Sequence, residues 1–148
     1  MLSVKDIMTK DVISVSPEMG IAHAAELLLE KGFNGVPVVD GTGNLVGLLC
    51  QSDLVAQQKK FPVPSVFTFL DGVISLTSMK QLEKELQKIT AMTVAEAMTP
   101  NPVTVGPETS IEEAGTIMVD RNFHTLPVVH EGELVGIMGK EDILRTLV

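Results

Sequence analysis

The sequence contains two copies of one unit, and this internal repeat restricts the possible folds more than any other feature. The first copy runs from Val4 to Val55 and the second from Val94 to Leu144, with one deletion at Thr42 in their alignment. Short blocks recur in the same order in both copies: Met-Thr, Pro-Glu, Pro-Val-Val and Leu-Val-Gly. A unit of this length buries too little surface to be stable alone, whereas two copies can cover each other's apolar faces. We therefore expect one module with a pseudo-two-fold axis and two related clefts.

Each copy has the pattern of a strand, a helix, a two-stranded hairpin and a second helix. In the second copy, Ser110 and Glu113 form a capping box at the first helix, and Asn122 suits its left-handed end. Gly32 has the same place in the first copy. Residues 40–44 lie between two apolar runs and predict a hairpin turn. The predicted fold class is α/β (α+β): two pseudo-symmetric units, each a small sheet with two helices, packed sheet to sheet.

The two copies are separated by a segment that matches neither of them. We predict unit 1 at residues 1–56, an inserted linker at 57–93 and unit 2 at 94–148. Residues 57–60 complete a helix that Pro62 and Pro64 break. A capping box of Ser78 and Gln81 then opens an amphipathic helix, whose apolar stripe comprises Met79, Leu82, Leu86 and Ile89. This helix is interpreted either as part of the packed core or as a lid over a ligand cleft or a dimer contact.

The charge balance disfavours nucleic acid as a partner. Nineteen acidic against eleven basic side chains give a formal net charge of −8, and aromatic residues make up only 3% of the chain. An acidic protein lacks the electrostatic footprint of a DNA-binding domain, and few aromatic rings are available for stacking on single strands. A small anion remains a possible ligand, because local dipoles bind a phosphate whatever the net charge.

Several other classes of protein are disfavoured by missing sequence features. The single cysteine, Cys50, cannot form an internal disulfide or a Cys-rich zinc site, and the histidines form no metal-ligand constellation. The N-terminus lacks the apolar core of a signal peptide, and the most apolar window, residues 63–76, is shorter than the ~20 residues of a membrane span. No P-loop, G-x-S-x-G or H-E-x-x-H motif occurs. We expect a cytoplasmic protein that is no enzyme and has no metal and no membrane partner.

The repeated blocks resemble the cystathionine-β-synthase (CBS) domain family. The pattern is a Met-Thr start, Pro-Glu before a helix, Pro-Val-Val, and Leu-Val-Gly followed after five residues by Asp; it occurs in both copies. The resemblance implies a tandem pair that assembles as a disc-like homodimer. It further implies adenosine-containing ligands, such as AMP, ADP or ATP, in the clefts between the units. Other members of the family bind S-adenosylmethionine or have no known ligand.

The resemblance also indicates candidate ligand-binding residues. Asp53 and Asp142 match the position that holds ribose, where a carboxylate can accept hydrogen bonds from both hydroxyls. Alternatively, each is an acidic residue favoured at a helix start. Three residues earlier, Cys50 and Gly139 replace the usual Ser or Thr that holds phosphate; Cys50 is also interpreted as a small buried residue. The remaining candidates lie near the adenine base or the first strand: Leu48, Ile137, Phe33, Asn34, Phe123, His124, Thr9, Ser14, Thr99 and Thr104.

Some of these candidates also have alternative roles that are purely structural. Core packing is an alternative role for Phe33 and Phe123, and capping for Thr9 and Thr99.

By resemblance, each cleft takes its ribose carboxylate from one copy and its base wall from the other. We expect a phosphorylated ligand to fill the Asp142 cleft first, with His124 at the phosphate.

Two functions remain open at this point. The first is a regulatory module that senses an adenosine nucleotide, or alternatively S-adenosylmethionine, and acts through a partner protein that the sequence does not identify. The second is a structural dimerisation module with vestigial clefts.

Overall fold

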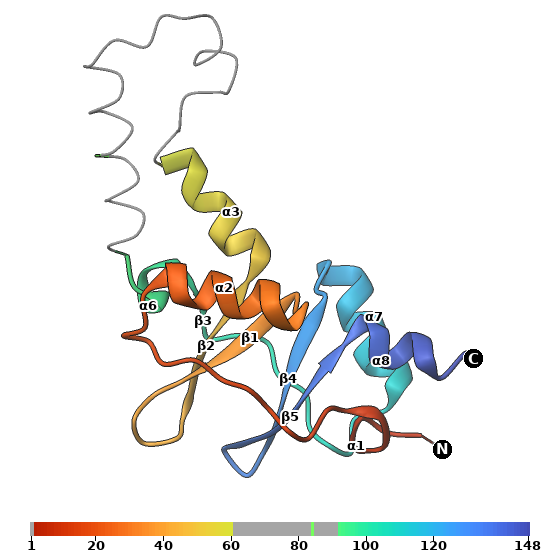
Figure 1. Ribbon diagram of the computed structural model, residues 1–148. Coiled ribbons are helices and arrows are strands. Elements are labelled where there is room, and N and C mark those ends of the chain that lie inside the picture. Colours follow the sequence, from red (N-terminus) through yellow and green to blue (C-terminus); the bar gives the residue numbers. More distant parts are fainter. Residues whose placement is uncertain (1, 61–83, 85–91) are drawn as a thin grey trace, which may run out of the picture.

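The computed structural model describes residues 2–60, 84 and 92–148. It contains helices and two small antiparallel sheets, which confirms the predicted fold class (Figure 1). The first half comprises α1 (Val4–Ile7), α2 (Ile21–Lys31), β1 (Gly35–Val39), β2 (Leu45–Cys50) and α3 (Gln51–Lys60). The second half comprises α6 (Val94–Ala97), β3 (Thr99–Pro100), α7 (Ile111–Arg121), β4 (Thr125–His130), β5 (Glu133–Gly139) and α8 (Lys140–Arg145).

The local signals in the sequence form the predicted helix ends and turn. The Ser110 side chain accepts a hydrogen bond from the Glu113 amide at 3.0 Å and so caps α7. Gly32 and Asn122 end α2 and α7 with φ angles of 67° and 55°, the left-handed conformation that these two residue types tolerate best. The hairpin of β1 and β2 closes where Val39 pairs with Leu45.

The first strand predicted for each copy is largely absent from residues 2–60 and 92–148. In the first copy, Thr9 and Val15 form isolated bridges with Ile137 and Val38. In the second copy, β3 has two residues, and Val105 forms an isolated bridge with Val128. Pro100 has no amide hydrogen to extend the pairing, and Asn101 has a φ angle of 49°, which turns the chain away. Backbone pairing at these sheet edges is therefore limited to short contacts.

The start of each repeat packs into the other unit. Val4 of α1 is fully buried in the core of β4, β5 and α7, and its amide donates to the Thr109 carbonyl at 2.8 Å. Val94 of α6 is fully buried in the core of β1, β2 and α2, and its amide donates to the Met19 carbonyl, also at 2.8 Å. We call residues 3–9 and 93–99 the exchanged segments. Each unit therefore completes its core with a segment of the other repeat.

Glycines in the second hairpin strand of each unit make room for the exchanged segments. A Cβ atom built on Gly136 would lie 3.0 Å from Cγ of Met8 and 3.1 Å from the Thr9 carbonyl oxygen. A Cβ atom on Gly47 would meet Met98 and the Thr99 carbonyl oxygen in the same way. The glycine of the Leu-Val-Gly block is thus explained by the close approach of another chain segment.

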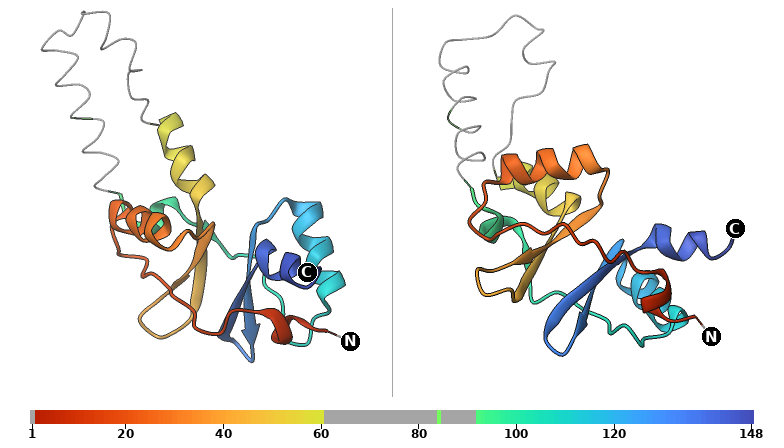
Figure 2. Two further views of the ribbon diagram at one scale, coloured as in Figure 1. Left: turned by 45° about the vertical axis from the view of Figure 1, so that its right-hand side comes forward. Right: turned by 60° about the horizontal axis from the view of Figure 1, so that its bottom comes forward.

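The two hairpins lie beside each other in the middle of the molecule, with the helices outside them. Figure 1 and Figure 2 show α2, α3 and α6 on the side of the first hairpin and α1, α7 and α8 on the side of the second. In the same figures both termini lie near the second unit, because α1 crosses to it.

The predicted insert falls mainly outside the described residues. Helix α3 ends at Lys60, where the sequence predicts a helix end. The predicted amphipathic helix after Ser78 lies outside the described part of the chain, apart from Lys84. Among the described helices, none combines the length and the apolar character required to cross a bilayer.

Candidate functional site

Two aspartates hold equivalent positions at the starts of the last helix of each unit. Asp53 is the third residue of α3 and Asp142 the third residue of α8. In both, Oδ2 accepts a hydrogen bond from the backbone amide three residues earlier, Cys50 or Gly139, at 2.8 Å. Each carboxylate therefore caps its helix, as expected for an acidic residue at a helix start. The second oxygen, Oδ1, remains for contacts on the cleft side.

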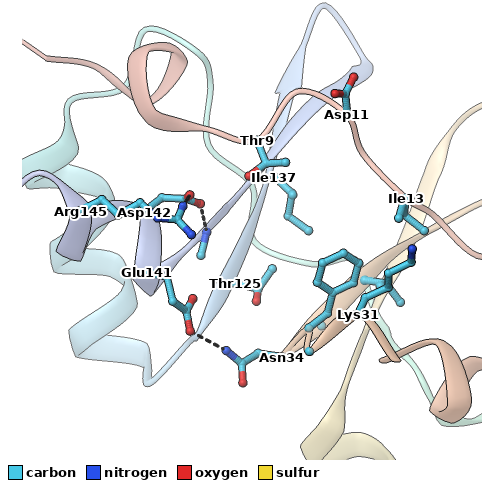
Figure 3. Close-up of a pocket in the computed structure, with 15 residues that line it drawn as sticks. Thr9, Asp11, Ile13, Lys31, Asn34, Thr125, Ile137, Glu141, Asp142 and Arg145 are labelled. Carbon is cyan, nitrogen blue, oxygen red and sulfur yellow. Dashed lines mark hydrogen bonds and ion pairs between the residues drawn. The ribbon is translucent and has the colours of Figure 1, made fainter. Parts of the chain in front are cut away.

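Beside Asp142 is a cleft of about 290 Å³ that residues of both copies line (Figure 3). Of the predicted residues, this cleft contains Thr9, Phe33, Asn34, Ile137, Gly139 and Asp142. Figure 3 shows Asn34 and Glu141 directed toward each other across it, and Asn34 Nδ2 donates to Glu141 Oε1 at 3.3 Å. The charged residues Asp11, Lys31, Glu141 and Arg145 also line the cleft.

Beside Asp53 is a larger cleft of about 1070 Å³, again lined by both copies. Of the predicted residues, it contains Asn34, Leu48, Cys50, Asp53, Thr99, Phe123 and His124. Arg121 and Asn122, at the end of α7, also line it, as do Gln51, Ser52 and Asn101. Among the described residues that line this cleft, Asp53 is the sole carboxylate.

Three sequence-based placements differ from the structure. Ser14 and Thr104 are exposed and line neither of these clefts, whereas their neighbours Val15 and Val105 are buried and form bridges to β1 and β4. His124 lines the Asp53 cleft and is not among the residues that line the Asp142 cleft, where the sequence-based prediction places it at a phosphate. In the Asp142 cleft, the charged side chain at this edge is Glu141, which is bonded to Asn34.

The sequence reasoning missed the basic residues at the ends of α2 and α7. Lys31 lines the Asp142 cleft and Arg121 lines the Asp53 cleft. The two positions are equivalent in the repeat, each directly before the residue with a left-handed φ angle. The signal that could have found them is their shared positive charge at equivalent positions of the repeat.

The Oδ1 atoms of the two aspartates have different partners. Thr99 Oγ1 donates to Asp53 Oδ1 at 3.1 Å, and Thr99 belongs to the exchanged segment of the second repeat. Arg145 Nη1 donates to Asp142 Oδ1 at 2.8 Å, and the Asp142 side chain is only 9% exposed. Asp142 is therefore paired with a positive charge, whereas Asp53 is contacted by a neutral hydroxyl.

Cys50 lines the Asp53 cleft as a partly buried thiol. Burial, followed by the negative charge of Asp53, raises the pKa of Cys50 to about 11. The thiol is therefore neutral near pH 7, as the alternative interpretation of a small buried residue requires.

We expect Cys50 to react slowly with alkylating reagents, because the thiolate is the nucleophile. A pKa near 11 should lower the alkylation rate at pH 8 about 100-fold relative to the unfolded chain, and the rate should rise with pH toward 11. Mass spectrometry of iodoacetamide-treated protein measures this rate, with denatured protein as the control. Equal rates in folded and denatured protein would contradict the burial of the thiol.

Comparison with known proteins shows which family this chain resembles. The sequence profile described as "CBS domain" matches residues 4–60 and 94–148. The chain is 32% identical over 148 residues to "CBS domain-containing protein CBSX2, chloroplastic" of Arabidopsis thaliana, covering 97% of this chain and 62% of that protein. It is 30% identical to "CBS domain-containing protein YhcV" of Bacillus subtilis, covering 97% of this chain and 84% of that protein. The chain thus spans less than two thirds of the length of the Arabidopsis relative.

Solved structures of similar proteins contain bound nucleosides and nucleotides. A crystal structure of CBSX2 in complex with AMP superposes with a TM-score of 0.75 at 29% identity, covering 99% of this chain and 96% of that one. A CBS domain pair of protein MJ0100, in complex with 5′-methylthioadenosine and S-adenosyl-L-methionine, gives a TM-score of 0.72 at 26% identity, covering 99% and 96%.

Proposed function

This chain belongs to the CBS domain family as a tandem pair, and we propose that it is a regulatory module that senses an adenosine-containing nucleotide in a cleft between its two units. The observation that carries this proposal is the Asp53 cleft, whose volume of about 1070 Å³ is ample for a small-molecule ligand. The AMP bound to CBSX2 supports the class of ligand. A regulatory role, without catalysis, agrees with a site that combines one carboxylate with hydroxyl, amide and basic groups.

Each part of the Asp53 cleft suits one part of an adenosine nucleotide. The Asp53 carboxylate can accept hydrogen bonds from two ribose hydroxyls, which charge assistance makes strong. Leu48 and Phe123 offer apolar surface to the base, and Arg121 and His124 provide the basic groups for a phosphate. The ligand is AMP, ADP or ATP in this proposal; S-adenosylmethionine, which MJ0100 binds, is the alternative.

Ligand binding should appear as thermal stabilisation. A ligand that binds only the folded protein, at 100 times its Kd, stabilises the fold by about 2.7 kcal/mol. In a chain of 148 residues this corresponds to an increase in Tm of about 5–10 °C. Differential scanning fluorimetry with AMP, ADP, ATP, 5′-methylthioadenosine and S-adenosylmethionine tests this, with GMP as the control. The proposed function is wrong if no adenosine compound changes Tm at millimolar concentration.

The second candidate function, dimerisation with unused clefts, is favoured by exposed apolar side chains at equivalent positions. Leu29 on α2 is 79% exposed and Val119 on α7 is 80% exposed. The other apolar side of α2 is not available for a dimer, because Ile21, Ala24 and Leu28 are buried in the core. We propose that the protein forms a homodimer through Leu29 and Val119, in either functional case.

Such a homodimer should be lost when its apolar contacts are replaced by charges. A pseudo-symmetric pair of apolar patches favours an isologous contact, in which the same surface of each copy takes part. We expect a dimer mass in light scattering at micromolar concentration, and a monomer mass for Leu29→Glu combined with Val119→Glu. Wild-type protein that scatters as a monomer would contradict this prediction.

The proposed location is the cytoplasm, where a sensor meets the free nucleotide pool and a single thiol stays reduced. In this proposal the module acts on an effector protein.

A further inference from the structure

The pseudo-two-fold axis makes each cleft a control for the other, because each residue that lines one cleft has an equivalent in the other copy. Four equivalent pairs at the clefts include a residue that is charged or can become charged in only one member. Glu141 corresponds to Ser52, Arg145 to Ala56, Asn34 to His124, and Asp11 to Asn101. In each pair except Asn34 and His124, the charged residue lines the Asp142 cleft and the neutral one the Asp53 cleft.

In the Asp142 cleft, the residues that differ form contacts with other residues of the protein. Arg145 Nη1 donates to Asp142 Oδ1 at 2.8 Å, which is an ion pair, whereas the equivalent oxygen of Asp53 accepts only from the neutral hydroxyl of Thr99 at 3.1 Å. Asn34 Nδ2 donates to Glu141 Oε1 at 3.3 Å, which joins the two units across the cleft (Figure 3). In the Asp53 cleft the equivalent residues, Ala56 and Ser52, have no group of that charge or length. The volumes of about 290 and 1070 Å³ agree with this difference.

The balance of acidic and basic residues also differs between the two clefts. Asp11, Glu141 and Asp142 face Lys31 and Arg145 in the smaller cleft, so acidic groups outnumber basic ones. In the larger cleft, Arg121 balances Asp53, and His124 adds a further basic group. A phosphate would therefore meet a lining in which acidic groups outnumber basic ones in the Asp142 cleft, and a lining with a single carboxylate in the Asp53 cleft. Like charges repel most where water is partly excluded.

We propose that the Asp53 cleft is the binding site for the phosphorylated ligand, and that Arg145 and Glu141 close the Asp142 cleft to it. This inference rests on the proposed function and reverses the sequence-based expectation that the Asp142 cleft fills first. It makes Arg145 and Glu141 determinants of stoichiometry: the chain binds one phosphorylated nucleotide tightly although it has two ribose-type aspartates.

The test exchanges the differing residues between the two clefts. Glu141→Ser with Arg145→Ala gives the Asp142 cleft the side chains of the Asp53 cleft, and Ser52→Glu with Ala56→Arg does the reverse. All four positions are exposed, so the core should stay intact; the Tm of each variant checks this. Isothermal titration calorimetry with AMP measures the number of sites and their affinities.

For wild-type protein we expect one tight site per chain. The first double variant should gain a second site or strengthen a weak one by about tenfold or more, and the second should weaken the tight site by a similar factor. Two equal sites in wild type, or a loss of binding in Glu141→Ser with Arg145→Ala, would overturn the inference while the proposed function stands. If neither wild type nor the variants bind AMP or any other adenosine compound, the proposed function itself fails.

Discussion

Replacing Val4 by Asp is expected to unfold the second unit of the protein, although Val4 belongs to the first repeat. Val4 is fully buried among Val105, Leu126 and Met138 of that unit. A carboxylate placed there without a partner would be strongly destabilising, in the class of substitutions that lower the free energy of unfolding by ~4 kcal/mol or more. The milder Val4→Ala should lower it by about 1.5–3 kcal/mol, the value of a buried valine side chain.

Hydrogen exchange measured by mass spectrometry locates the effect, and Val94 provides the matched control. In Val4→Ala, amide protection should fall in β4, β5 and α7, while β1 and β2 change less. In Val94→Ala, the pattern should be reversed, because Val94 is buried in the core of the first unit. Loss of protection in the unit nearest in sequence, for either variant, would contradict the exchange of segments.

Asp53→Ala is expected to weaken nucleotide binding by about 10–100-fold. The carboxylate is proposed to accept two hydrogen bonds from ribose, and bonds to a charged group contribute about 1.5–3 kcal/mol, which corresponds to this range of Kd. Isothermal titration calorimetry with AMP measures the loss. Asp53→Asn should lie between wild type and Asp53→Ala, because an amide oxygen still accepts one hydrogen bond without the charge.

Asp142→Ala is the matched control for this prediction. Both substitutions remove a carboxylate that accepts a backbone amide at 2.8 Å at the start of a helix. Both variants therefore lose the same helix-start hydrogen bond and some thermal stability, and a comparison of their AMP affinities shows the effect on the ligand. If Asp142→Ala removes the tight site and Asp53→Ala leaves it, then the assignment of the two clefts is reversed.

The repeat and its local signals were sufficient to predict the fold class. Ser110, Gly32 and Asn122 act through contacts and φ angles within a few residues, so their roles can be read directly from the chain. The hairpin turn at residues 40–44 is equally local. The sequence blocks that these signals separate are those of the CBS domain family, and the profile match at residues 4–60 and 94–148 bears this out.

The exchange of segments could not be derived from local signals. A buried valine such as Val4 has the same sequence pattern whichever core receives it, because hydrophobic burial is not directional. Gly47 and Gly136 indicate a close approach, and only the tertiary structure shows that Met98 and Met8 make it.

For the candidate site too, some features follow from the sequence and others only from the tertiary structure. The sequence by itself determined that two aspartates recur in register, since their place at a helix start follows from the repeat. The tertiary structure alone decided that Thr99 meets Asp53 while Arg145 meets Asp142, and that Glu141 bonds Asn34 across the smaller cleft. The physical reason is that the Thr99–Asp53 and Asn34–Glu141 contacts join residues far apart in the chain. Even the short-range pair of Arg145 and Asp142 depends on where α8 directs its side chains relative to the cleft.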